Sequence, residues 1–136
     1  MAQDPTGEQI MASFHQWLYG NYPRTRKLCY HIPNGGLRTG REAMALKAKG
    51  VTAGMPDYEV AIPANGYPSL RIEFKGKYEP LTDSQKEVIP VLRKAGHLVH
   101  ICDDLQKAKD VLLNYLSTTD YLKPLPTPPQ QTKLSL

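Results

Sequence analysis

Residues 69–75 constrain the fold most, because polar and apolar side chains alternate along the whole segment. Successive side chains of a β-strand point to opposite faces of its sheet. The apolar set is Leu70, Ile72 and Phe74, and the charged set is Arg71, Glu73 and Lys75. We therefore predict a strand with one face on a hydrophobic core, which requires neighbouring strands and a covering layer of helices.

A second segment, residues 57–62, has the pattern of a hairpin partner. It is separated from the first by a loop rich in turn-forming residues, Pro63 to Pro68. Only registers that match apolar with apolar side chains keep charges out of the core. Two registers fit: one places Asp57 opposite Glu73, and the other places Asp57 opposite Lys75. Because cross-strand neighbours have Cβ atoms about 4.5–5.5 Å apart, both registers gather these three side chains on one face.

The remaining apolar patterns and turn signals predict four helices and two further strands. We expect helices over residues 8–19, 40–49, 82–95 and 104–116, and strands over residues 28–32 and 97–102. The element order is then α-β-α-β-β-α-β-α. A hairpin together with a strand–helix–strand crossover predicts an α/β fold with a mixed β-sheet of about four strands, flanked by helices.

Apolar residues at helical spacing define the face that each long helix is expected to bury. In the first helix they are Ile10, Met11, Phe14, Trp17 and Leu18. In the helix that starts at Thr82 they are Val88, Val91, Leu92 and Ala95, and in the last helix they are Leu105, Ala108, Val111, Leu112, Tyr115 and Leu116. Thr82 and Gln85 have the spacing of a capping box, and Pro90 is expected to kink its helix.

The chain has 136 residues, which suits one domain. We assign residues 1–122 to that domain and residues 123–136 to a Pro-rich tail, which cannot form a helix or a central strand. No apolar run reaches the roughly 18 residues of a membrane helix, and no secretory signal is expected. Cys29 and Cys102 lie in apolar runs, so we expect free buried thiols and a reducing compartment.

The net charge is +4, and the basic residues are unevenly distributed. Between residues 21 and 50 there are seven Lys and Arg but one acid, Glu42. This stretch is either a solvated face or a surface that faces phosphates.

Asp57, Glu73 and Lys75 together suggest a chemistry. Two close carboxylates repel each other unless a cation lies between them, and that cation is either Lys75 or a divalent metal. Oxygen ligands in this number suit Mg²⁺ or Mn²⁺. Taken alone, the three residues favour an ordinary half-exposed sheet face. The preceding Gly54-Met55-Pro56 weakens that reading, because it sets an abrupt entry that places Asp57 at the start of its strand.

Several motifs occur in an order that resembles a known family. They are His31-Ile32-Pro33-Asn34-Gly35-Gly36 with Arg38, Gly54-Met55-Pro56-Asp57, Glu73-Phe74-Lys75, Leu81 to Gln85, Gly96-His97-Leu98-Val99 and Tyr115-Leu116. Together they resemble the VRR-NUC (virus-type replication–repair nuclease) family of the PD-(D/E)XK superfamily. The resemblance implies a restriction-endonuclease-like fold and metal-dependent phosphodiester hydrolysis with Mg²⁺ or Mn²⁺.

The resemblance also assigns roles to residues at the matching positions. Asp57, Glu73 and the backbone carbonyl of Phe74 would bind the metal, and Lys75 would position the attacking water or help to deprotonate it. Two further catalytic candidates are Gln85 and Glu8. For each there is an alternative role: Gln85 as the residue that completes the capping box, and Glu8 as a favourable acid near a helix N-terminus.

Small members of the family resemble homodimeric junction resolvases, which implies branched DNA such as a Holliday junction as substrate and a second copy of the chain as partner. The candidate DNA-binding residues are Asn34, Arg24, Arg26, Arg38, Arg41 and Lys77. Alternatives are a flap, nicking or restriction-like nuclease on duplex DNA, a catalytically silent DNA-binding module, or a generic α/β binding protein. We expect no membrane partner and a cytoplasmic location in a bacterial or phage-infected host cell.

Overall fold

The computed structural model describes residues 3–33 and 40–127. Within them the chain forms the expected α/β fold in the expected order, with one added 3₁₀ turn, η1. The helices are α1 (Gly7–Asn21), α2 (Gly40–Ala48), α3 (Asp83–Lys94) and α4 (Leu105–Leu116), and η1 covers Pro23–Thr25. The strands are β1 (Cys29–His31), β2 (Tyr58–Val60), β3 (Leu70–Phe74) and β4 (Leu98–Cys102).

The described strands form one mixed sheet in the order β1-β2-β3-β4. The first two pairings are antiparallel, and β3 pairs with β4 in parallel across the crossover through α3. Tyr58 lies opposite Ile72, so continuation of this register places Asp57 opposite Glu73. Of the two registers that the sequence allows, the structure adopts the first. Strands β2 and β3 are each shorter than the alternating pattern predicted.

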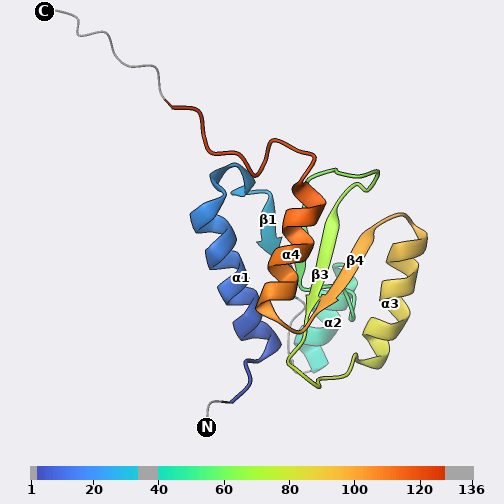
Figure 1. Ribbon diagram of the computed structural model, residues 1–136. Helices are drawn as coiled ribbons and strands as arrows, with labels where there is room; N and C mark the ends of the chain where they lie inside the picture. The colour runs from blue at the N-terminus through green and yellow to red at the C-terminus, as the bar shows by residue number, and fades with distance from the viewer. Residues whose placement is uncertain (1–2, 34–39, 128–136) are drawn as a thin grey trace, which may run out of the picture.

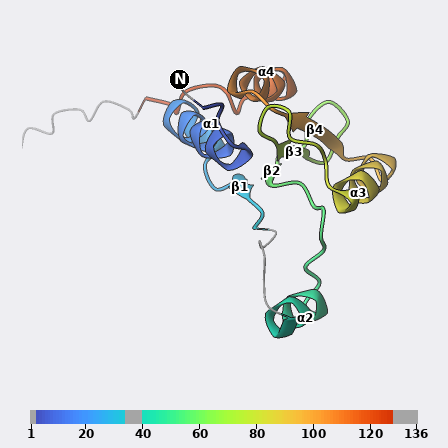
Figure 2. The ribbon, with the colours of Figure 1, turned by 90° about the horizontal axis from the view of Figure 1, so that it is seen from below.

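Helices α1 and α4 lie side by side on one face of the sheet (Figures 1 and 2). Their apolar stripes meet those of β2 and β3 in a core that includes Phe14, Leu18, Tyr58, Ile72 and Leu112. The aromatic rings of Phe14 and Tyr58 pack edge to face with centroids 5.4 Å apart. Both expected helix faces are confirmed, with Met11, Trp17, Leu105 and Val111 only partly buried at their margins.

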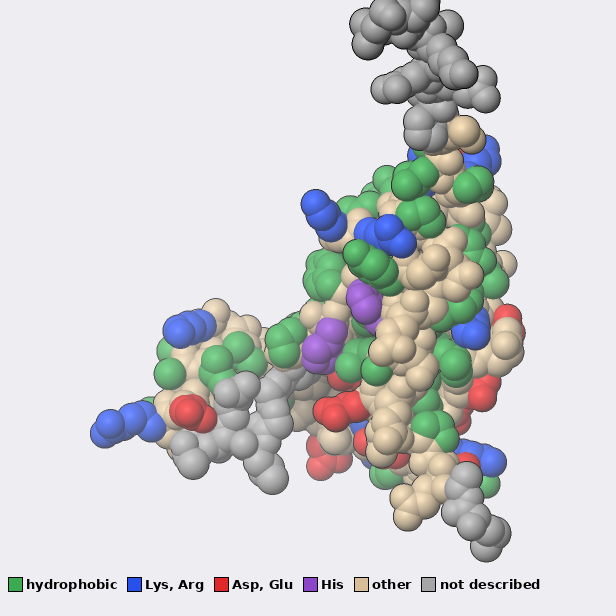
Figure 3. All heavy atoms as spheres, turned by 90° about the vertical axis from the view of Figure 1, so that its left-hand side faces the viewer, with side chains coloured by type: hydrophobic (Ala, Val, Ile, Leu, Met, Phe, Trp, Pro, Cys, Tyr) green, Lys and Arg blue, Asp and Glu red, His purple; other side chains and the backbone are tan. Residues whose placement is uncertain are grey.

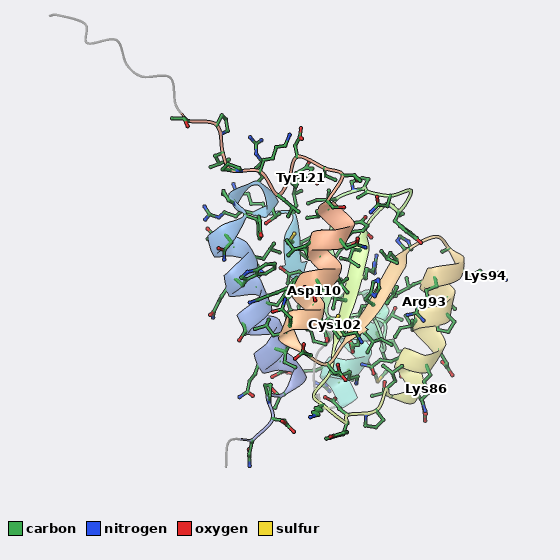
Figure 4. All side chains as sticks on the ribbon, viewed as in Figure 1. Lys86, Arg93, Lys94, Cys102, Asp110 and Tyr121 are labelled. Carbon is green, nitrogen blue, oxygen red and sulfur yellow. The ribbon has the colours of Figure 1, made fainter. Side chains whose placement is uncertain are left out.

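Helix α3 packs beside β4, and its buried face differs from the predicted one. Ile89 is buried, whereas Val91 is 67% exposed and Ala95 is exposed. The reason is that α3 meets the sheet mainly along β4, so a narrower stripe than the predicted one is covered. Arg93 fixes this arrangement by donating from Nη2 to the carbonyl of Val99, at 2.9 Å (Figure 4). Pro90 lies inside the helix, as expected.

Helix α2 stands away from the sheet and buries none of its residues (Figure 2). Both cysteines are free and buried, as predicted. Among the described helices, none is long and apolar enough to cross a membrane. The first part of the Pro-rich tail contacts its own chain, because Arg24 donates from Nε to the carbonyl of Pro124 at 3.2 Å.

Candidate active site

Two acidic side chains meet where β2 begins and β3 ends. The backbone N–H of Asp57 donates to Oε2 of Glu73 at 3.3 Å, and the backbone N–H of Phe74 donates to Oδ2 of Asp57 at 3.1 Å. Each carboxylate is therefore held by the backbone of the opposite strand. Glu73 is only 1% exposed, and the following Lys75 is 4% exposed. An ordinary half-exposed sheet face does not bury such charges, because their desolvation is costly without compensating partners.

The protonation of Glu73 reflects this burial. Desolvation is the largest cause that raises its pKa to about 8, followed by the hydrogen bond and the negative charge of Asp57. The positive charge of Lys75 opposes the shift without cancelling it. Near neutral pH Glu73 therefore keeps its proton in the metal-free protein. A divalent cation would take the place of that proton, since it neutralises both charges at once.

Gln85 contacts the acidic pair from the first turn of α3. Its Nε2 donates to Oε1 of Glu73, while its Oε1 accepts from the backbone N–H of Thr82 at 2.9 Å. The hydroxyl of Thr82 accepts in turn from the backbone N–H of Gln85 at 3.2 Å, which completes the capping box. One side chain thus caps the helix and contacts a candidate metal ligand, so the two roles considered for it are geometrically compatible.

Two glycines allow the backbone to converge on this point. A Cβ added at Gly54, whose φ is +89°, would lie 2.4 Å from the carbonyl oxygen of Ser84 in α3. A Cβ added at Gly7 would lie 2.5 Å from the carbonyl oxygen of Phe74. Side chains are excluded at both positions. The abrupt entry before Asp57 is thus explained by a close approach to α3, and the start of α1 rests against the Phe74 carbonyl.

Lys75 is paired with an acid that the sequence analysis did not single out. Its Nζ lies 3.4 Å from Oε2 of Glu79, whose other oxygen accepts from the backbone N–H of Gly76 at 2.9 Å. That backbone bond is the main cause that lowers the pKa of Glu79, with a further contribution from Lys75. Glu79 therefore stays ionised and holds the lysine ammonium in place. Lys75 and Glu79 come together only through the turn between β3 and α3, so no strand or helix periodicity in the sequence predicts this ion pair.

These groups line one pocket of about 360 Å³. Its lining includes all five predicted catalytic residues, and the full set is Thr6, Gly7, Glu8, Asp57, Glu73, Phe74, Lys75, Glu79 and Gln85. Glu8 is exposed and reaches the pocket from the first turn of α1. The structure thus brings the sequence-predicted catalytic set together, with Glu79 as an addition.

The donor set fits a hard cation with a large share of water ligands. Among the described residues, no group of three or more His, Cys, Asp and Glu side chains could hold a metal ion. The pocket instead offers the carboxylates of Asp57 and Glu73 and the main-chain oxygen of Phe74. Mg²⁺ is usually bound in this way, through one or two carboxylates with waters and substrate phosphate oxygens as the other ligands.

The predicted DNA-binding residues are not gathered on one surface. Lys77 lies two residues after Lys75, which lines the pocket, and its Nζ is 5.3 Å from the centre of the Tyr78 ring. Arg41 is exposed on α2. Arg24 and Arg26 lie beyond the opposite end of α1, and a helix of this length spans about 22 Å. Asn34 and Arg38 lie outside the described residues.

Arg24 and Arg26 are both held by residues near them at the far end of α1. The guanidinium of Arg26 lies 4.2 Å from the centre of the Tyr19 ring, and its Nε donates to the Tyr19 carbonyl at 2.9 Å. Arg24 lines a hollow with Asp120 and Tyr121. Figure 4 places Tyr121 at the end of the molecule away from Cys102, whose carbonyl accepts from the backbone N–H of Lys75. These two arginines are therefore remote from the pocket on the same chain.

Comparison with known proteins now identifies the family. The sequence profile of the VRR-NUC domain matches residues 5–104, which include every element from α1 to β4. The chain belongs to the VRR-NUC domain family. A solved structure described as "VRR_NUC domain protein" has the same fold, with a TM-score of 0.68, 24% sequence identity and coverage of 85% of this chain and 91% of that one. No curated protein sequence matches the chain.

Membership of the VRR-NUC family makes this chain a nuclease of the PD-(D/E)XK type with a restriction-endonuclease-like fold. Nuclease domains of this type generally use divalent metals. A nuclease domain also implies DNA as the substrate. The family match ends just before α4. That helix nevertheless packs on α1 and supplies Leu112, Tyr115 and Leu116 to the core, so it is part of the same folded unit.

Proposed function

We propose that this VRR-NUC domain is an endodeoxyribonuclease that requires Mg²⁺ or Mn²⁺ and cleaves branched DNA, with a Holliday junction as the favoured substrate. The observation that carries the proposal is the carboxylate pair of half-buried Asp57 and fully buried Glu73, which lies with buried Lys75 in one pocket. We further propose that the protein acts in the reducing cytoplasm of a bacterial or phage-infected cell, which its free buried thiols support.

Asp57, Glu73 and the Phe74 carbonyl would hold the cation. When bound, the cation supplies Lewis-acid activation of the scissile phosphate and of the attacking water. Gln85 orients Glu73 through its Nε2 donor, so that the carboxylate keeps one geometry. The Lys75 ammonium provides a fixed positive charge next to the carboxylates, where it can hold the attacking water and stabilise charge on the phosphorane.

A homodimer is part of the proposal, because a four-way junction requires paired cuts on opposite strands. Each chain provides one catalytic pocket within its described residues. Two pockets related by a two-fold axis would match the symmetry of the junction. A dimer would also add basic surface, since a single domain of this size reaches few phosphates.

The direct test is cleavage of four labelled DNA substrates: a four-way junction, a flap, a nicked duplex and an intact duplex. Each is incubated with Mg²⁺, with Mn²⁺ and with EDTA. We expect metal-dependent cleavage that is fastest on the junction and absent in a folded Asp57→Asn variant. Preference for a flap or for plain duplex would reassign the substrate. Junction binding without cleavage under every metal condition would identify a catalytically silent module.

A further inference from the structure

The turn between β3 and α3 holds a tyrosine in a backbone conformation that favours glycine. The backbone N–H of Glu79 donates to the carbonyl of Gly76 at 3.0 Å, which closes a four-residue turn. The third residue of this turn, Tyr78, has a φ of +68°. A turn with positive φ at its third residue favours Gly or Asn, because the Cβ of a bulky residue is strained there. The backbone alone would therefore select a residue other than tyrosine.

Contacts within the chain do not explain this choice. Tyr78 is 85% exposed, and its ring centre lies 5.3 Å from the Nζ of Lys77, which is exposed as well. Within residues 3–33 and 40–127, the Tyr78 hydroxyl has no hydrogen-bond partner. Asn65 also has a positive φ, of 52°, but asparagine tolerates this conformation and the Asn65 amide binds the carbonyl of Tyr115. Backbone strain at a residue without such a role in its own chain is typical of ligand contacts.

The turn is part of the rim of the catalytic pocket. Lys75 and Glu79, on its two sides, both line that pocket. The carboxylate of Glu79 accepts from the backbone N–H of Gly76 at 2.9 Å and pairs with the Lys75 ammonium at 3.4 Å, so the turn is fixed relative to the lysine. Figure 1 shows this connection at the same end of the molecule as the start of α1, which supplies other lining residues. The Cα of Tyr78 is only about 3.8 Å from that of Glu79, because the two residues are consecutive.

The charge around the pocket gives an uncharged contact particular value. The lining includes four acids against Lys75, and they are Glu8, Asp57, Glu73 and Glu79. In Figure 3 acidic side chains gather toward the lower end of the visible face, where α1 begins. Charge therefore contributes little attraction for DNA at this end of the chain. An aromatic ring attracts a base through its π face, and this contact needs no opposite charge.

We propose that Tyr78 stacks on a base whose face is uncovered at a branch point of the DNA, next to the phosphate that occupies the catalytic pocket. The inference rests on the proposed function in placing a DNA phosphate at Asp57 and Glu73. Successive nucleotides of a duplex strand are about 3.4 Å apart along its axis, so bases beside the cut are within reach of a side chain next to Glu79. The neighbouring Lys77 ammonium is available to a phosphate of the same strand.

Stacking by Tyr78 would make the domain prefer branched DNA. In an intact duplex each base is covered on both faces by its neighbours, and it would have to leave the stack before the ring could bind it. At a branch point the stack is interrupted, so a base face is available without that cost. Tyr78 is thus a substrate-positioning residue, and the clamp formed by Glu79 sets its place relative to Lys75.

The test compares a four-way DNA junction with an intact duplex made from one of its arms. Fluorescence anisotropy measures the binding of each to the full chain, with Ca²⁺ in place of Mg²⁺. We expect Tyr78→Asn, which suits the positive φ but lacks a ring, to bind the junction about tenfold more weakly than the wild type, the scale of one base–aromatic contact. Its affinity for the duplex should not change. Tyr78→Phe, which keeps the ring, should retain the wild-type preference.

Thermal unfolding separates a binding role from a structural one. A ring that supports the fold would lower the melting temperature when it is removed. Tyr78→Asn and Tyr78→Gly should instead melt at the same temperature as the wild type or higher, because both relieve the strain of positive φ. The binding change and the unchanged or raised stability must therefore occur in the same variant.

A matched control is available at the other end of α1. Tyr19 is 52% exposed, and its ring also has a cation partner, the Arg26 guanidinium at 4.2 Å. It lies about 18 Å along the helix axis from Gly7, which lines the pocket. Tyr19→Ala removes this ring and should leave the affinities for junction and duplex unchanged.

A direct contact can be detected by photocrosslinking. A 5-iododeoxyuridine placed at the branch point of the junction is irradiated in the complex, and mass spectrometry identifies the attached peptide. We expect the peptide that contains Tyr78. Attachment elsewhere, an equal junction-to-duplex ratio for the wild type and Tyr78→Asn, or no binding of the junction by the wild type overturns the proposal. A Tyr78→Asn variant that weakens both DNAs by the same factor also overturns it.

Cleavage of the same junction with Mg²⁺ is measured on the same wild-type preparation. Absence of cleavage refutes the proposed nuclease function, and a ring-dependent preference for the junction would still stand as a separate result. Cleavage by a wild type whose preference does not depend on Tyr78 refutes the stacking contact and leaves the nuclease function standing.

Discussion

Gln85 donates from its Nε2 to the buried carboxylate of Glu73 while its Oε1 caps the helix that carries it. The chain contains a second capping box with the same bonds, formed by Thr6 and Gln9 at the start of α1, in which no carboxylate of residues 3–33 and 40–127 accepts a hydrogen bond from the glutamine. This pair separates the two functions of Gln85, because both glutamines cap a helix and only one contacts the site.

We predict that Gln85→Ala lowers both stability and metal-dependent activity, whereas Gln9→Ala lowers stability alone. Each variant keeps its threonine N-cap and loses only the reciprocal bond from the N-cap N–H, so each should cost well under about 2 kcal/mol of unfolding free energy. Only the Gln85 variant should also need a higher Mg²⁺ concentration for half-maximal cleavage, because partners of metal ligands typically contribute about 10–100-fold to metal affinity or activity. Thermal unfolding and Mg²⁺ titration of cleavage measure the two effects. An unchanged Mg²⁺ requirement in folded Gln85→Ala would restrict the residue to its cap.

Glu73 predicts how pH affects the metal-free protein. Its pKa is about 8 in the folded state, chiefly through burial, against an ordinary value of 4.5. Between these values the unfolded chain has lost a proton that the folded chain keeps, so rising pH favours unfolding. The stability that the protonated carboxyl contributes is complete below pH 4.5 and is lost as pH rises through 8.

The measurement is the melting temperature in EDTA across that pH window, for the wild type and for Glu73→Gln. The wild type should lose stability relative to the variant as pH rises, since glutamine has no proton to release. Added Mg²⁺ should stabilise the wild type more at the upper end of the window, because the cation no longer competes with a proton. Parallel pH profiles for the two proteins would contradict the raised pKa.

The alternating pattern of residues 69–75 and its predicted hairpin partner over residues 57–62 were sufficient to predict that Asp57, Glu73 and Lys75 share a face. The direction of each side chain in a strand follows from its position in the local sequence. The choice between two registers was not predictable, since both keep apolar side chains in the core. The pairing of Lys75 with Glu79 depends on the path of a turn, and the remoteness of Arg26 depends on the direction in which α1 runs. Such features arise from tertiary structure and leave no periodic signal.

Lys75 and Glu79 should affect turnover and binding in different ways. Lys75→Ala should reduce the single-turnover rate by about 10²–10⁴-fold, the usual scale for a proton-transfer or charge-stabilising group, while junction binding survives. Glu79→Gln removes a negative charge from the mouth of the pocket and loosens the lysine. It should therefore lower KM for DNA and lower kcat as well. Glu87→Gln, an exposed acid on α3 outside the pocket, is the control and should change neither constant.

The salt dependence of binding can locate the DNA on the protein surface. The sequence predicted Arg24, Arg26, Arg41 and Lys77 as contacts, and the structure separates the first two from the pocket. The slope of log affinity against log salt concentration is negative, and each lost phosphate contact reduces its magnitude by about one. We expect Lys77→Ala and Arg41→Ala to make the slope shallower and Arg26→Ala to leave it unchanged. A shallower slope in Arg26→Ala would mean that the DNA extends along α1 to its far end.

The remaining prediction concerns the homodimer and the Pro-rich tail. An extended Pro-rich tail could cross to a partner chain, but Pro124 accepts a hydrogen bond from Arg24 of its own chain, so the first tail residues contact their own domain. We therefore expect the full chain and a chain ending at Leu122 both to be dimers by light scattering at micromolar concentration. A monomeric full chain would remove the dimer from the proposed function. A dimer that dissociates only on truncation would show that residues after Leu122 bridge the two copies.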